Sequence, residues 1–148
     1  MRVTLNISKD KAWAVVNYLD TKKYLCLDDK TTSRTDLLIF AIALGFNRGY
    51  PSDRTSAKSS IVRTEYFHEQ KHLFSAIFYH HFIKTGDKTI DSITDDNAKL
   101  SLVESFAETG FEVIKEKYES DSDETFCYEL ISQMDEWYDE YFVSTEGK

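Results

Sequence analysis

Residues 34–48 read RTDLLIFAIALGFNR, and every position from Leu37 to Phe46 in this stretch is apolar or glycine. Ser33 precedes it as a helix N-cap with Asp36 in the place of a capping-box acid, and Gly49 follows as a helix stop. A helix without a polar face has to be buried all round. We therefore expect residues 34–48 to form the central helix of the fold.

The first residues predict a strand and a helix that lead into this stretch. Residues 2–7 read RVTLNI and alternate between polar and apolar side chains, which is the period of a half-buried strand. Ser8 can cap the helix that follows over residues 9–20, where apolar residues recur at helical spacing. Residues 1–50 are thus expected to form a strand–helix–helix core unit, and the apolar patch at residues 24–27 is a strand or a packed loop.

The remainder of the chain predicts three longer helices. They cover residues 65–84, 95–118 and 124–142, and Gly110 in the second allows close approach to another helix. The predicted fold is mainly α, with about five helices wrapped around the central apolar helix (34–48) and one or two short N-terminal strands. We expect a single domain over residues 1–148, in which residues 64–142 are a three-helix remainder with an acidic last helix.

Charge is distributed unevenly along the 148 residues. The net charge is −8, but residues 1–64 carry 11 basic and 6 acidic side chains, whereas residues 65–148 carry 7 and 20. This asymmetry is typical of a molecule that binds unlike surfaces, and the acidic total argues against nucleic acid covering the whole protein.

Cellular location is predicted by what the sequence lacks. No apolar run approaches the roughly 20 residues that span a bilayer, and the N-terminus has no signal-peptide pattern. Cys26 and Cys127 stand alone, without metal-site spacing. We expect a cytoplasmic protein with reduced thiols, no cofactor and no membrane partner.

One motif suggests zinc chemistry. His68-Glu69-Gln70-Lys71-His72 matches H-E-x-x-H, which on a helix places two imidazoles one turn apart with a glutamate as general base. Lys71 puts a positive charge between the ligands, and a third ligand would have to be Glu104 or Glu108. Ordinary surface histidines explain His68 and His72 better, so the zinc hydrolase is the weakest alternative and we expect no catalytic residues.

The N-terminal strand supports a DNA-binding alternative. Strand, helix, helix is the order of a ribbon-helix-helix half, in which paired strands of a dimer read the major groove. The candidate contacts are Arg2, Thr4, Asn6, Lys9 and Lys11. An unpaired strand edge would favour a homodimer. Against this alternative, about a dozen residues separate the two helices.

The last helix predicts a docking surface for a partner protein. Its apolar residues recur at helical spacing, and the other face is rich in acids. Aromatic residues dominate binding hot spots. The candidate contacts are Asp135, Glu136, Trp137, Tyr138, Asp139, Glu140 and Tyr141.

Two segments carry a family resemblance. Residues 36–49, DLLIFAIALGFNRG, and residues 103–114, VESFAETGFEVI, resemble the small accessory proteins associated with DNA phosphorothioation (dnd) systems, the family numbered four in common naming. The chain departs from that pattern in its longer acidic end from Ser120 onward and at Thr109, where an amide residue is expected.

The resemblance implies a bacterial accessory protein linked to anti-phage defence or DNA modification, and it implies no catalytic site. We therefore expect a non-enzymatic accessory or adaptor subunit of a prokaryotic defence system that binds the protein subunits of a defence complex. Contact with DNA, direct or through those subunits, is the alternative.

Overall fold

The computed structural model describes residues 2–24, 33–52, 57–86, 95–120 and 125–140. Within these ranges the chain forms two strands, five α-helices and one 3-10 helix, η1. In chain order the elements are β1 (Thr4–Ser8), α1 (Ala12–Lys22), α2 (Arg34–Arg48), β2 (Lys58–Arg63), η1 (Thr64–Phe67), α3 (Lys71–Thr85), α5 (Asp96–Ser120) and α6 (Phe126–Tyr138). The mainly helical class with a short sheet is confirmed.

The chain divides into two compact units. The first covers residues 1–113 and holds the sheet, α1, α2, α3 and most of α5; the second covers residues 114–148 and holds the end of α5 together with α6. None of the described helices combines the length and the apolar character needed to cross a bilayer.

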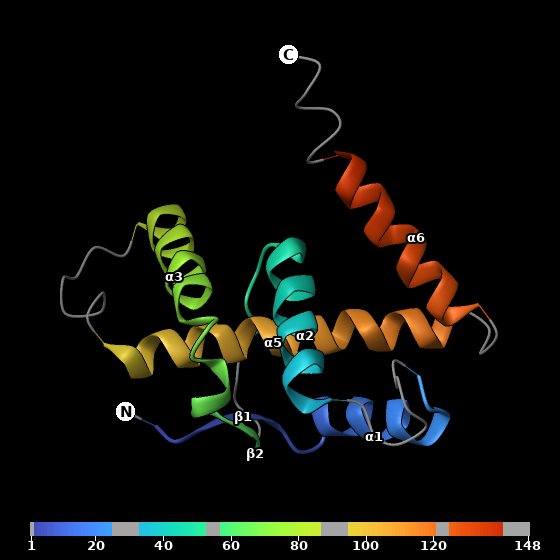
Figure 1. Ribbon diagram of the computed structural model, residues 1–148, viewed down its shortest axis with the longest axis horizontal. Helices are drawn as coiled ribbons and strands as arrows, with labels where there is room; N and C mark the ends of the chain where they lie inside the picture. Colours follow the sequence, from blue (N-terminus) through green and yellow to red (C-terminus); the bar gives the residue numbers. More distant parts are fainter. Residues whose placement is uncertain (1, 25–32, 53–56, 87–94, 121–124, 141–148) are drawn as a thin grey trace. The chain divides into compact units, whose positions relative to one another are not determined.

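The sheet consists of β1 and β2 in antiparallel pairing (Figure 1). Thr4 pairs with Arg63 and Ser8 with Lys58, and a register shift falls between Leu5 and Asn6. The predicted alternation is visible in β1, since Leu5 and Ile7 are fully buried while Thr4 is only half-buried. The second strand lies at residues 58–63, and the patch at residues 24–27 falls largely outside the described residues.

Helix α2 begins and ends where its sequence signals predict. The Ser33 hydroxyl accepts a hydrogen bond from the Asp36 backbone N–H, and Gly49 adopts a left-handed conformation (φ 99°) with its N–H donating to Gly45 O. Only glycine takes that conformation without steric cost. The helix is not enclosed on every side, because Ala43 is exposed.

Helices α2 and α5 cross at two glycines, backbone against backbone (Figure 1). A Cβ added to Gly45 would lie 1.8 Å from the Phe106 carbonyl oxygen, and one added to Gly110 would lie 1.7 Å from that of Ala41. No real side chain fits at such distances. The close approach predicted for Gly110 is confirmed, and α5 has a continuous buried run over residues 106–111 at this crossing.

The helix predicted over residues 65–84 is broken in the structure. Residues 64–67 form η1, a turn follows, and α3 starts only at Lys71. The break has a packing reason, because it lets the rings of Phe67 and Phe74 approach to 5.4 Å between centroids, with both side chains buried. In a continuous helix those two residues would be separated by about 10 Å along the axis.

Candidate functional site

Two buried carboxylates on α5 hold the edge of β1 that faces away from β2. Glu104 Oε1 accepts a hydrogen bond from the Asn6 backbone N–H (2.7 Å), and Glu108 Oε1 accepts one from the Ser8 N–H (2.6 Å). Glu108 Oε2 also accepts from the Ser8 hydroxyl at 2.7 Å. Both glutamates are buried, with exposures of 1% and 7%. Buried charge is tolerated here because hydrogen-bond donors surround it.

The two carboxylates of α5 and the two N–H groups of β1 have nearly the same spacing. Residues four apart on a helix are about 6 Å apart along its axis, and residues two apart on a strand are separated by about 6.7 Å. Glu104 and Glu108 therefore present carboxylates at nearly the spacing at which Asn6 and Ser8 present their N–H groups. Sequence reasoning missed this pairing. The available signal was two acids four apart within the apolar stripe of α5, together with a strand that alternates.

Arg2 also contacts α5, through its side chain and its backbone. Its Nη1 lies 3.2 Å from Glu104 Oε2 in an ion pair, and its Nη2 donates to the Ser101 hydroxyl at 3.2 Å. The backbone N–H of Arg2 donates to the side chain of Asn97 at 3.0 Å. The guanidinium thus fastens the start of β1 to α5.

These contacts bear on the predicted DNA-reading residues. Arg2 is bound to α5, and Thr4 donates from its hydroxyl to the Asn6 side chain at 3.4 Å. Lys9 and Lys11 are exposed just after the strand. A ribbon-helix-helix dimer pairs this strand with a second copy, but here β2 occupies one edge of β1 and the α5 carboxylates occupy the other.

The H-E-x-x-H segment does not lie on one helix. His68 follows η1, residues 69–70 form a turn, and His72 is in the first turn of α3, so the two histidines do not belong to one continuous helix as the zinc motif requires. The candidate third ligands Glu104 and Glu108 instead bind β1. Across the described ranges, no three His, Cys, Asp or Glu side chains gather as a metal site would require.

Helix α6 carries an exposed apolar stripe. Leu130 is buried, but four large apolar side chains on an adjoining arc are exposed: Tyr128 (76% exposed), Ile131 (57%), Met134 (49%) and Tyr138 (60%). At 100° per residue these four lie within about a third of the helix circumference. Most surface helices bury such a stripe, whereas this one leaves it accessible.

Acidic residues border the stripe. Asp135, Glu136, Asp139 and Glu140 are exposed, and residues 125–140 contain no lysine or arginine. Trp137, one of the predicted anchors, is half-buried, while Tyr138 is exposed. Tyr141 lies outside the described residues.

An aromatic cluster joins the ends of α2 and α3 to α5. Phe46 contacts His80 and Phe106 edge-on at 5.1 and 5.5 Å between ring centroids, and His81 contacts Phe106 at 5.7 Å. Burial lowers the pKa of His81 below 6.5, and the nearby Lys84 and His80 add to this effect. The neutral imidazole is therefore favoured at this position.

Thr109 also has a structural role. Its buried hydroxyl donates to the Tyr50 carbonyl at 2.9 Å and lies 2.9 Å from the Ser52 hydroxyl. Thr109 thus fixes the segment that leaves α2.

No protein-family model, curated protein or solved structure matches this chain.

Proposed function

We propose that this protein is a non-enzymatic adaptor that docks a partner protein through α6. The observation that carries the proposal is the exposed stripe of Tyr128, Ile131, Met134 and Tyr138 on a helix whose charged residues are all acidic. Large apolar patches rimmed by charge are typical of protein interfaces, and tyrosine is enriched among the residues that dominate binding energy.

The charge of α6 specifies the chemistry of the partner. Five acidic residues and no basic ones in residues 125–140 favour a basic surface that also carries apolar side chains. An amphipathic basic helix is one such surface, because its apolar face can cover the stripe while its cations meet the border.

The biological setting is the second part of the proposal. We place the adaptor in a prokaryotic anti-phage or DNA-modification-linked defence complex in the cytoplasm, with other protein subunits as its partners. This part is supported only by the resemblance to dnd-associated accessory proteins. The two segments that carry it, 36–49 and 103–114, contain the glycines of the α2–α5 crossing.

The DNA-reading alternative requires a strand whose edge and polar side chains are available. Arg2 and both edges of β1 already have partners within the chain. The geometry therefore favours docking through α6 over DNA reading by β1.

The test compares how much partner protein co-purifies with the wild type, with a variant of the stripe and with a matched control variant. The tagged chain is purified from its native host with and without nuclease, beside the variant Ile131→Ser/Met134→Ser/Tyr138→Ser. The control is Tyr66→Ser/Leu73→Ser/Ile83→Ser, which removes exposed apolar side chains of η1 and α3.

A co-purified protein should be identified, expressed separately and titrated against all three chains. We expect nuclease-resistant binding by the wild type and the control, and at least tenfold weaker binding by the stripe variant. Equal binding by both variants would overturn docking through α6. Recovery of nucleic acid alone, lost on nuclease treatment, would favour DNA binding instead.

A further inference from the structure

A pocket of about 380 Å³ opens between η1, the first turns of α3 and the start of α5. Its apolar lining consists of Leu5, Phe67, Phe74 and Leu100, all of them buried residues of the core. The volume lies near the lower end of the range of about 300–1,000 Å³ that small-molecule sites occupy. The cavity is therefore suited to a small ligand with an apolar body.

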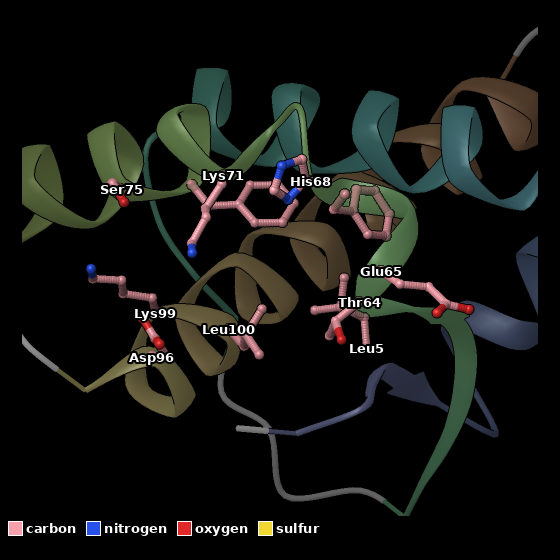
Figure 2. Close-up of a pocket in the computed structure, with 11 residues that line it drawn as sticks. Leu5, Thr64, Glu65, His68, Lys71, Ser75, Asp96, Lys99 and Leu100 are labelled. Carbon is pink, nitrogen blue, oxygen red and sulfur yellow. The ribbon is translucent and has the colours of Figure 1, made fainter.

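Cationic side chains gather at one end of this pocket. Figure 2 shows Lys71 from α3 and Lys99 from α5 both reaching toward the space between these helices, with Ser75 at the same end. Lys99 Nζ lies 5.9 Å from the ring centroid of Tyr79, and within the described part of the chain neither ammonium has a carboxylate within ion-pair distance.

Two acids also line the pocket, and their positions differ. Glu65 is paired with Arg63 at 3.5 Å, and Figure 2 shows its carboxylate pointing away from the lysine end. Asp96 lies near Lys99 at the start of α5. The lysine end therefore has two cations against one anion, so its charge is positive.

We propose that this pocket binds a small organic anion whose apolar body, about the size of a fused ring pair, rests on the Phe67 and Phe74 side. Its carboxylate or phosphate meets the ammonium groups of Lys71 and Lys99, and the Ser75 hydroxyl can donate to the same group. Lysine serves this purpose as a point charge, which does not demand a fixed anion geometry. This site is separate from α6 and does not depend on the adaptor proposal.

The ligand class is tested with three probes on the full chain. These are 1-naphthoate, its neutral counterpart 1-naphthalenemethanol, and acetate, which has the charge without the apolar body. Binding is followed by NMR through backbone amide shifts. We expect saturable shifts for 1-naphthoate at residues 71–75 and 96–100, with at least fivefold weaker binding of the other two probes.

The charges are tested by variants of opposite expected effect. Lys99→Gln and Lys71→Gln should each weaken 1-naphthoate binding about two- to fivefold, as solvent-exposed charge pairs do, whereas Asp96→Asn should strengthen it. Lys58→Gln removes the same charge from the exposed face of β2 and should change nothing. Ser75→Phe keeps both lysines and should block binding by filling the cavity.

Several outcomes would overturn the proposal. They are the absence of saturable shifts at residues 71–75 and 96–100, equal affinity for the neutral probe, and equal weakening by Lys58→Gln and Lys99→Gln. Amide spectra of each variant verify that the fold is retained, so a loss of binding reports on the pocket.

Discussion

Helices α5 and α6 are both amphipathic, yet they use polar and apolar residues in opposite ways. Helix α5 buries two glutamates, because the N–H groups of β1 satisfy their carboxylates, and it brings a glycine against α2. Helix α6 leaves four large apolar side chains in solvent and has acids around them. Burial therefore follows the available partners more closely than side-chain polarity: the carboxylates of α5 are buried because donors meet them, whereas four large apolar side chains of α6 remain exposed.

The largest expected effect is at the α2–α5 crossing. Gly110→Ala should lower the free energy of unfolding by about 3 kcal/mol or more, because the new methyl group overlaps the Ala41 carbonyl and the helices have to separate. Chemical denaturation measures this change. Ala43→Leu adds more volume at an exposed position of α2 and should be nearly neutral. If Gly110→Ala stabilised the protein, as helix propensity alone predicts, the close crossing would be wrong.

The carboxylate pairing should give a graded effect. Glu108→Ala should cost about 2–3 kcal/mol of unfolding free energy, because the Ser8 N–H and hydroxyl lose their acceptor in a buried setting. Glu108→Gln should cost less, because the amide oxygen can still accept the N–H bond. Denaturation of both variants beside Glu112→Ala, an exposed position one turn later, measures the series. Equal losses for Glu112→Ala and Glu108→Ala would contradict the pairing.

The adjacent residues Leu130 and Ile131 test the buried and the exposed side of α6 separately. Leu130→Ala should destabilise the protein by about 2–3 kcal/mol, because Leu130 is 4% exposed. Ile131→Ser should change stability by less than about 0.5 kcal/mol, because that side chain is 57% exposed. Urea unfolding monitored by circular dichroism compares them. A large loss for Ile131→Ser would show that this exposed side chain is needed for folding, which would contradict its assignment to a docking surface.

The smallest expected effect is a pH dependence at His81. Its pKa is lowered in the fold, mainly by burial, so the unfolded chain binds the proton more readily. Protonation of His81 should not reduce the free energy of unfolding above the unfolded pKa of about 6.5. This free energy should decrease as the pH falls from about 6.5 to the lowered pKa of the folded state. His81→Phe keeps the ring against Phe106 and should flatten this part of the profile, measured as melting temperature against pH. An unchanged profile would assign the pH dependence to other groups.

Local signals in the sequence predicted much of the fold. Ser33 and Gly49 set the ends of α2 because capping depends on hydrogen bonds within one turn. The alternation of residues 2–7 predicted β1, and the acids and aromatic residues of residues 135–141 pointed to the last helix as a candidate surface, although of the four exposed stripe residues only Tyr138 was among them. Gly110 was recognised as a place of close approach, although its partner was not.

The partners themselves were decided by the tertiary structure. No local pattern states that Glu104 and Glu108 will meet the N–H groups of β1 about a hundred residues away, or that Gly110 will rest on Ala41. The break that separates His68 from His72 likewise depends on Phe67 reaching Phe74, and the pocket forms only where η1, α3 and α5 meet. Sequence determines which residues can cap, alternate or pack, whereas long-range packing decides which buried group satisfies another.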